Sequence, residues 1–275
     1  MSLNSVNTNI GAQVALQSLN RTNEALNVTQ KRISTGLRVN DAKDDGAAFA
    51  VAQAVRADVA GLTAANEQLG GVKGILDTAL SGLTKVSETM VKVRETLVRL
   101  ADDTLNTEQR AQYTAQYTAL RTQIQNFITD ATYNGRTLLA TAAPGGNIVT
   151  TRNESGTTYT ITAGDGAGTL LVAAAPATAT AAQTALGASG DFQTIQTAIS
   201  NALNTFGSDS RYIDAQVAYN KDKADALEAG LGALIDADLA KESARLQSLQ
   251  IRQQLGTQAL SIANQAPQTL LSLFR

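Results

Sequence analysis

Two segments of this 275-residue chain have residue types that bind ions. The first is an acidic loop, Leu37–Gly46, which contains three aspartates. A calcium loop of the EF-hand type, counted from Asp41, needs an oxygen ligand at its third position and a glutamate at its twelfth. Those positions are Lys43 and Ala52, so we do not predict a calcium site. The aspartates instead suit the start of a following helix, where the helix dipole favours anionic side chains.

The second segment is the glycine-rich stretch Gly164–Gly168. A phosphate-binding loop of this kind is followed by Lys-Ser or Lys-Thr and opens a helix. No such pair follows here, and we predict no helix at this point. The segment is therefore predicted to be a plain turn.

The composition argues against catalysis. The chain has no His, no Cys and no Trp. It therefore lacks the usual general base near neutral pH, the commonest zinc ligand and thiolate chemistry. A metalloprotease helix with the H-E-x-x-H motif is impossible. We predict that the protein is not an enzyme and has no cofactor and no metal site.

Charge and hydropathy restrict the partners. A formal net charge of −2 predicts no nucleic-acid partner, since such a partner requires a clustered positive surface. No segment approaches the roughly 18 uninterrupted apolar residues of a membrane span, so we predict no membrane insertion. The first residues lack the basic and apolar regions of a cleaved secretory signal. A secreted form of this chain would have to leave the cell by another route.

The strongest structural pattern lies at the two ends of the chain. Apolar and small residues recur there at alternating spacings of three and four, which is typical of a coiled-coil seam. The N-terminal seam is Ala12, Leu16, Leu19, Asn23, Leu26, Gln30 and Ile33, and the C-terminal seam is Ile235, Leu239, Glu242, Leu246, Leu249, Gln253, Gly256, Leu260 and Ala263. We predict that the N-terminal helix ends at Gly36 and pairs with the C-terminal helix, which closes the chain into a long hairpin.

The C-terminal segment has a second apolar row. It consists of Ile251, Leu255, Ile262 and Ala266. A helix with two apolar faces needs more than one neighbour. We predict that the second neighbour is another copy of the chain.

Three more helices are predicted between the ends. The seam from Leu62 to Leu100 is unbroken and, at about 1.5 Å per residue, makes a rod of roughly 58 Å. The next helix follows Asn106, its predicted N-cap, with Gln109 completing a capping box. The last runs from about Phe192 to Leu234. The predicted fold class is mainly α, a long coiled-coil helical hairpin or bundle rod with a small β-hairpin insert.

The insert, residues 141–189, is low in charge. Asn147–Thr151 and Thr157–Ala163 alternate and are rich in β-branched residues, which predicts a hairpin, with Thr169–Ala173 as a third strand. Five glycines lie in or beside the helix predicted from Leu62 to Leu100. We interpret these glycines, Gly61, Gly70, Gly71, Gly74 and Gly82, as places where a neighbouring subunit comes close.

Charged residues cluster near the predicted helix junctions. The carboxylates are Asp44, Asp45, Asp236, Asp238 and Glu242, and the predicted cationic partners are Arg32, Arg38, Lys43 and Lys241. If pairing lowers the pKa values of these carboxyls, acid should weaken any assembly that contains them.

The ends also carry motifs that resemble those of a known family. Asn7-Thr8-Asn9 and the run Lys31–Ala48 closely resemble the N-terminal region of bacterial flagellin. Ile235–Glu242, Gln250-Ile251 and Ala263–Leu273 resemble its C-terminal region, and Tyr133-Asn134-Gly135 matches the turn that ends the third helix of the family. The resemblance covers about residues 1–140 and 190–275, in family order and spacing.

The resemblance implies a structural subunit of the bacterial flagellar filament, which serves motility. Residues 1–44 and 236–275 would form the inner core coiled-coil domain. Residues 45–140 and 190–235 would form the helical rod domain, with 141–189 as its variable insert. The chain would be exported unfolded through a flagellar type III apparatus into the extracellular flagellum. Its partners would be other copies of itself, an export chaperone on the C-terminal helix, the filament cap and the hook-associated proteins.

Three sets of residues are assigned to these roles. The predicted polymerisation and core interface is Leu16, Leu19, Leu26, Ile33, Leu246, Leu249, Ile251, Leu255, Leu260, Ile262, Leu270 and Leu271. Solvent-facing sites for O-linked sugars are predicted at Thr150, Thr151, Ser155, Thr157 and Thr158. Many flagellins have an Arg, a Leu and a Glu that an animal innate immune receptor recognises. The matching positions are Lys92, Thr96 and Gln116, which predicts a poor receptor ligand.

Two alternatives remain at this stage. A hook–filament junction protein has related terminal helices. A secreted coiled-coil adhesin would form a small closed bundle, whereas a flagellin forms an open helical polymer.

Overall fold

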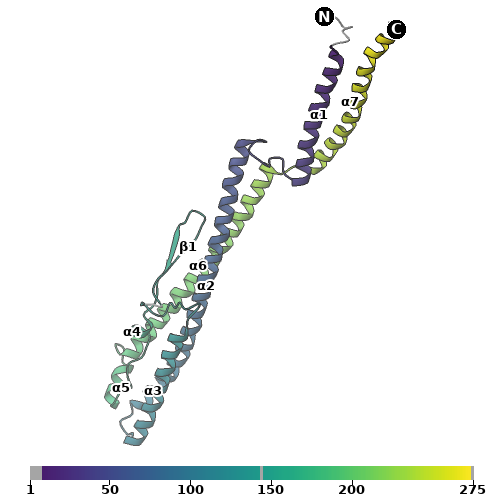
Figure 1. Cartoon of the computed structure of the whole chain (residues 1–275). Coiled ribbons are helices and arrows are strands. Elements are labelled where there is room, and N and C mark those ends of the chain that lie inside the picture. Colours follow the sequence, from purple (N-terminus) through teal and green to yellow (C-terminus); the bar gives the residue numbers. More distant parts are fainter. Residues whose placement is uncertain (1–7, 143–144, 274–275) are drawn as a thin grey trace. The chain divides into compact units, whose positions relative to one another are not determined.

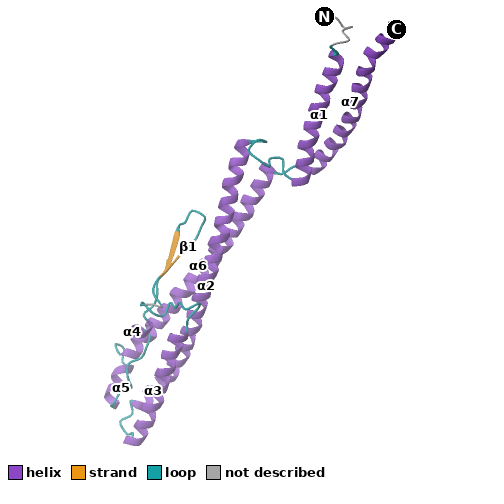
Figure 2. Ribbon diagram, viewed as in Figure 1, coloured by secondary structure: helices purple, strands orange, loops and turns teal. Residues whose placement is uncertain are grey.

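The computed structural model describes residues 8–142 and 145–273, with the backbone alone for Ala167 and residues 266–273. Within these residues the chain is mainly helical (Figures 1 and 2), as the sequence predicts. The elements in chain order are α1 (Ile10–Thr35), α2 (Gly46–Leu100), α3 (Thr107–Asp130), β1 (Ile148–Thr151), β2 (Thr158–Ile161), α4 (Gly166–Thr169), α5 (Ala179–Leu186), α6 (Asp191–Ile235) and α7 (Leu239–Leu273). Backbone contacts divide the chain into two compact units: unit 1 is Met1–Ala57 with Ala226–Arg275, and unit 2 is Asp58–Asp225.

Unit 1 contains the predicted terminal hairpin. Helices α1 and α7 lie side by side and antiparallel (Figure 1). Asn9 caps α1 by accepting a hydrogen bond from the Ala12 N–H, and its amide donates to the Ala263 carbonyl at 2.7 Å. At the other end, Gly36 has φ +72° and its N–H closes the last turn of α1. The predicted pairing and the predicted end of the first helix are both confirmed.

The seam between α1 and α7 differs in one respect from the predicted one. On α1, Ala15 and Thr29 face the partner helix, whereas the predicted Leu16 and Gln30 are exposed. The observed seam alternates spacings of three and four in the opposite order from the predicted seam. The two patterns have every second residue in common, so both include Leu19 and Leu26. On α7 the predicted seam residues are covered from Glu242 onward. Leu239, the first residue of the helix, is exposed.

Unit 2 is built around α2, α3 and α6. Every predicted seam residue of α2 from Leu62 to Leu100 is buried, and from Leu69 onward they form one cluster with α3, α6 and the insert. The start of α3 also agrees with the prediction, since Asn106 and Gln109 form a reciprocal capping box. Long helices of this kind are stabilised mainly by such side-chain packing.

The insert forms an antiparallel hairpin in which Ile148 pairs with Ile161 and Thr151 with Thr158. Its tip docks on the α2–α6 pair through polar contacts. The fully buried Asn220 donates to the Asn66 side chain and to the Arg152 carbonyl, both at 2.9 Å.

An ion pair of 2.6 Å joins Lys223 to Glu154 at the same hairpin tip. The ring of Tyr159 in β2 stacks on the ring of Tyr212 in α6, with centroids 4.2 Å apart. These contacts fix the position of the hairpin on unit 2.

Two predictions about the insert are wrong. Thr169–Ala173 forms no strand. The glycine-rich segment is not a plain turn, because Asp165 caps the one-turn helix α4 by accepting a hydrogen bond from the Gly168 N–H. The carbonyls of Val172 and Ala173 accept hydrogen bonds from the Arg121 and Tyr117 side chains of α3, so they are satisfied without a strand partner.

The glycines of α2 also require a correction. A Cβ on Gly61 would lie 3.1 Å from the Glu154 side chain, and one on Gly74 would lie 2.8 Å from the Tyr133 ring. A Cβ on Gly82 would lie 2.8 Å from the Ala131 Cβ and 3.1 Å from the Phe127 carbonyl. At these three positions the close neighbour belongs to the same chain and not to another subunit. Gly70 and Gly71 have nothing within 4 Å of an added Cβ.

This difference gives a direct stability test. We expect Gly82→Ala to lower the free energy of unfolding by about 1–3 kcal/mol, since the added methyl group overpacks against backbone and core. The matched variant Gly70→Ala should raise it by about 1 kcal/mol through helix propensity alone. Thermal unfolding followed by circular dichroism measures both changes, and equal shifts of the same sign would contradict the packing argument.

Candidate interaction surfaces

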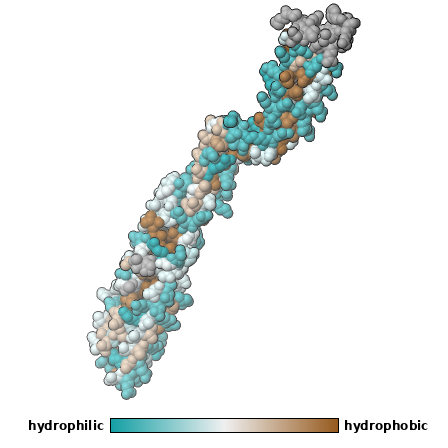
Figure 3. Space-filling model, in the orientation of Figure 1, coloured by the Kyte–Doolittle hydropathy of each residue, from teal (hydrophilic) through white to brown (hydrophobic). Residues whose placement is uncertain are grey.

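The α1–α7 pair has apolar side chains on both of its outer sides. On α7, Ile251, Leu255 and Ile262 are 58%, 59% and 68% exposed. Their spacing of four and seven places them on one face, opposite the seam that includes Leu249 and Leu260. Figure 3 shows apolar surface on this pair of helices.

Helix α1 has a corresponding outer row. Ile10, Val14 and Val28 are exposed and lie on the side of α1 away from the seam, with the exposed Gln17 and Arg21 between Val14 and Val28 on that side. The pair is therefore a covered seam between two uncovered apolar rows, one on each helix. Exposed apolar rows of this kind mark interaction surfaces in soluble proteins.

The predicted interface residues fall into separate groups. The seam residues Leu19, Leu26, Ile33, Leu246, Leu249 and Leu260 are buried or half-buried, and Leu16, Ile251, Leu255 and Ile262 are exposed. The side chains of Leu270 and Leu271 lie outside the described residues. The structure thus separates the predicted set into residues that join α1 to α7 and residues that remain free for another molecule.

A buried ion pair crosses the seam. The Arg32 guanidinium on α1 lies 3.2 Å from the Glu242 carboxylate on α7, and both side chains are largely buried. The Nε of Arg32 and the second carboxylate oxygen of Glu242 have no hydrogen-bond partner. Both residues belong to the predicted sets of junction charges, although the sequence did not pair them specifically, and the contact ties the start of α7 to the end of α1.

The acidic loop is held by a cation that is not among the predicted partners. The Lys31 ammonium lies 2.7 Å from Asp41 and 3.6 Å from Asp44. The hydrogen bond from Lys31 lowers the pKa of the Asp41 carboxyl, and hydrogen bonds from the Asn40 and Asp41 N–H groups lower the pKa of Asp44. Asp45 accepts from the N–H groups of residues 47 and 48 and so caps α2.

The spacing of Lys31 and Asp41, ten residues apart across a turn, is not a helical i to i+4 pattern, so no sequence periodicity indicated it. Arg38 also departs from the prediction, because it donates to the Leu234 carbonyl and not to a carboxylate. Asp238 accepts from the Lys241 N–H and caps α7. The junction is thus built mainly from caps and backbone contacts.

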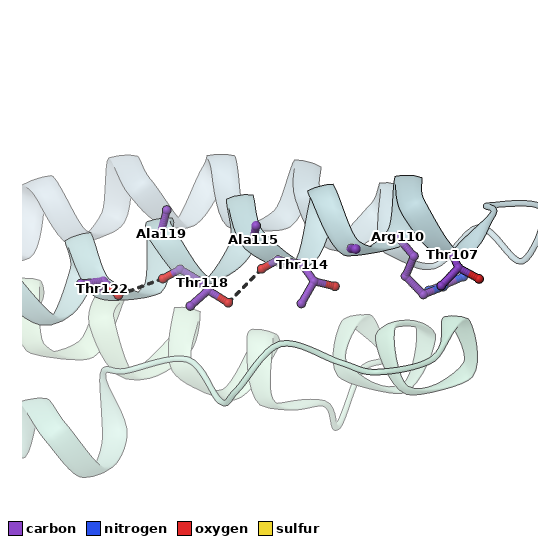
Figure 4. Close-up of a pocket in the computed structure, with 8 residues that line it drawn as sticks. Thr107, Arg110, Thr114, Ala115, Thr118, Ala119 and Thr122 are labelled. Atoms are coloured by element: carbon purple, nitrogen blue, oxygen red, sulfur yellow. Dashed lines mark hydrogen bonds between the residues drawn. The ribbon is translucent and has the colours of Figure 1, made fainter.

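One face of α3 is an open, shallow depression lined by threonine and alanine (Figure 4). The hydroxyls of Thr118 and Thr122 donate to the carbonyls of Thr114 and Thr118, one turn earlier on the same helix. The protons of these hydroxyls are therefore already used, and their oxygens can only accept further hydrogen bonds. Among the residues that the structure describes there is no group of three or more potential metal ligands and no helix apolar enough to cross a membrane.

The three predicted receptor positions differ in exposure. Lys92 and Gln116 are exposed, but Thr96 is only 3% exposed and its hydroxyl donates to the Lys92 carbonyl. Of the three predicted receptor positions, Thr96 therefore does not lie on the exposed surface of the chain. Its place on the buried face of α2 follows from the core stripe beside it.

Among the predicted sugar sites, Ser155, Thr157 and Thr158 are exposed and Thr151 is half-buried. Thr150 is 5% exposed, so its prediction as a solvent-facing site is wrong. Strand alternation explains this result, because Thr150 lies on the inward face of β1 with Ile148.

Known sequences match the chain at both ends and along its whole length. The model of the bacterial flagellin N-terminal helical region matches residues 6–143, and that of the C-terminal helical region matches residues 192–274. Flagellin FljK of Caulobacter vibrioides is 39% identical over 100% of both chains. A flagellin of Brucella melitensis is 36% identical, over 98% of this chain and 99% of its own.

A crystal structure of Bacillus cereus flagellin aligns with 66% of this chain and 94% of that chain at 18% identity and a TM-score of 0.34, so the assignment rests on the sequences. The matches favour neither a junction protein nor an adhesin. The chain belongs to the bacterial flagellin family, whose members are the structural subunits of the flagellar filament.

Proposed function

We propose that this flagellin polymerises through the two outer apolar rows of its α1–α7 pair. The observation that carries the proposal is that the rows lie on different helices, each opposite the shared seam. A contact between the α7 row of one copy and the α1 row of the next joins two different surfaces. Such heterologous contacts extend into an open polymer unless the rotation closes a ring.

The domain roles follow from this proposal. Residues 1–44 and 236–275 form the inner core coiled-coil domain, and residues 45–140 and 190–235 form the helical rod domain, with 141–189 as its short insert. The contact-based division lies further into α2 and α6, at residues 57/58 and 225/226. Val39, Ala48, Ala52 and Ile235 are buried together, so this cluster packs the loop after α1 against the start of α2 and the end of α6, where the two proposed domains meet in the sequence.

Export and delivery form a further part of the proposal. The subunit passes unfolded through a flagellar type III apparatus to an extracellular filament, with a chaperone on α7 before export. It then adds beneath the filament cap. The exposed row on α7 supports this role, since an apolar face that waits for a neighbour needs protection before assembly.

The first assembly test compares neighbouring positions on α7. We expect Ile262→Asp to abolish polymerisation, because a carboxylate would have to be desolvated in the contact. Ser261→Asp adds the same charge beside it but off the row, and should polymerise normally. Sedimentation of filaments measures the outcome. Normal filaments from Ile262→Asp would contradict the proposed contact.

Acid should disassemble the filament. The pKa values of Asp41 and Asp44 are lowered in the folded loop. A carboxyl whose pKa is lower in the folded state than in the unfolded state stabilises the fold at pH values above its unfolded-state pKa, which is about 4. That contribution is lost as the pH falls through the folded-state pKa.

Light scattering during an acid titration measures this loss. In Lys31→Gln the pKa of Asp41 should be lowered less, so the midpoint of disassembly should move to higher pH. A flat titration to about pH 3, or an unchanged midpoint in the variant, would refute this account.

Receptor recognition gives a third test. We expect weak activation of the animal innate immune receptor, since Lys92 cannot make the planar two-point contact of Arg and Gln116 lacks the charge of Glu. Lys92→Arg combined with Gln116→Glu should raise activation in a reporter-cell assay. Thr96→Leu should mainly reduce stability, by about 1–3 kcal/mol, because the site is buried. Full activation by the unaltered protein would overturn the expectation.

A further inference from the structure

Two tyrosines from distant parts of the chain lie face to face in unit 2. The chain has six tyrosines, and Tyr159 of β2 and Tyr212 of α6 form the one stacked pair of aromatic rings in the part of the chain that the structure describes. Their ring centroids are 4.2 Å apart and the ring planes differ by 26°. Because the centroids of aromatic pairs usually lie about 4.5–7 Å apart, this contact is a close one.

The phenol of Tyr159 has a base within reach. Its Oη donates a hydrogen bond of 2.6 Å to the carboxylate of Asp209, which lies three residues before Tyr212 on α6. This distance is typical of a charge-assisted O–H···O⁻ bond. Burial, and then the hydrogen bond to Asp209, raise the pKa of Tyr159 to about 12, so the phenol keeps its proton near neutral pH and holds it against the carboxylate.

The phenol of Tyr212 is held by the hairpin. The Arg152 guanidinium, in the loop between β1 and β2, donates a hydrogen bond to the Tyr212 Oη at 3.1 Å. Both tyrosines are half-buried. The rings are therefore fixed relative to each other, and part of their surface stays accessible to a small diffusible molecule.

The other four tyrosines lack this combination. Tyr133 and Tyr219 are 45% and 60% exposed. Tyr117 is 3% exposed and donates to a backbone carbonyl, and Tyr113 has an arginine over its ring. Among the described residues, only Tyr159 has both a second phenol stacked on its ring and a carboxylate that accepts its hydrogen bond.

We propose that Tyr159 and Tyr212 form an oxidative cross-linking site, at which a diffusible one-electron oxidant joins the two rings as dityrosine. A phenol loses an electron more readily when its proton can move to a hydrogen-bonded base in the same step, and Asp209 is that base for Tyr159. The centroids of two directly bonded rings lie about as far apart as the centroids of this stacked pair. Coupling therefore requires the rings to turn and not to approach each other.

The coupling removes two electrons and two protons in total. Each phenol loses one electron to the oxidant and its O–H proton, that of Tyr159 to Asp209 and that of Tyr212 to water. The two neutral radicals form one carbon–carbon bond between ring carbons next to the phenol oxygens. Each of these carbons then loses its hydrogen as a proton, while each oxygen regains one. Two equivalents of the one-electron oxidant are reduced.

The product ties β2 to α6 by a covalent bond. A cross-link between residues far apart in sequence stabilises a fold mainly by restricting the unfolded chain. The hairpin then stays on α6 even when the polar contacts of Asn220 and Lys223 break. The inference concerns a single subunit and does not depend on the proposed polymerisation.

Photo-oxidation of the dilute, unassembled subunit tests the site. The oxidant is ruthenium tris-bipyridine, excited with visible light, with persulfate as the electron acceptor. We expect dityrosine fluorescence in the monomer-sized band, a mass lower by two hydrogen atoms, and a peptide in which Tyr159 is joined to Tyr212. The cross-linked monomer should also unfold at a higher temperature than the untreated one.

Three variants provide the controls. Tyr159→Phe keeps the stacked ring but removes the phenol, and it should abolish the product in the monomer-sized band. Tyr219→Phe removes an exposed tyrosine and should leave that product unchanged. Asp209→Asn can still accept a hydrogen bond but is no longer a base, so it should slow coupling by about tenfold or more.

The outcomes are distinct. Dityrosine confined to dimer-sized bands, or formed equally in the Tyr159→Phe monomer, would overturn the proposal, as would hydroxylation of Tyr159 without coupling. An unchanged rate in Asp209→Asn would refute the role of that carboxylate, and an unchanged unfolding temperature would refute the stabilisation. Peptide mapping of the unaltered protein identifies the joined residues even if Tyr159→Phe is unstable.

Discussion

The apolar stripe of α2 is the contact on which unit 2 depends. Leucines at regular intervals, such as Leu76, Leu83 and Leu97, are fully or almost fully buried against α3, α6 and the insert. Because an isolated helix is only marginally stable in water, this stripe stabilises α2 through tertiary packing more than through propensity. It also sets which residues reach the surface, and it places Thr96 inside the unit and Lys92 outside.

Polar contacts fix the position of the hairpin on this apolar packing. An apolar stripe does not by itself fix the alignment of a neighbouring element along it, because its side chains are similar and several alignments would bury them. The buried Asn220, which bonds to Asn66 and to the Arg152 carbonyl, is satisfied at one position of the hairpin only. A single buried amide can therefore specify alignment, as it does in coiled coils.

The terminal helices use the same packing for a different purpose. Their seam is covered within the chain, but each helix keeps an apolar row on its far side. In the proposed polymer, these exposed rows are the surfaces that meet neighbouring copies.

Periodicity and capping signals in the sequence determined much of this fold. They predicted the stripe of α2, the pairing of the two ends, the end of α1 at Gly36, the capping box at Asn106 and the hairpin. These features are local, or they follow from one repeating pattern, so they can be predicted from the amino-acid sequence alone. The exposed row of Ile251, Leu255 and Ile262 could be predicted for the same reason.

Only the tertiary structure determined which neighbour each residue meets. It showed Ala15 and not Leu16 in the seam, Lys31 as the partner of Asp41, and Thr150 facing inward. It also distinguished Gly74, which has Tyr133 against it, from Gly71, which has nothing. These facts depend on the rotation of each helix and on contacts between residues far apart in sequence. Local spacing does not contain that information, because packing selects one of several arrangements that satisfy the same pattern.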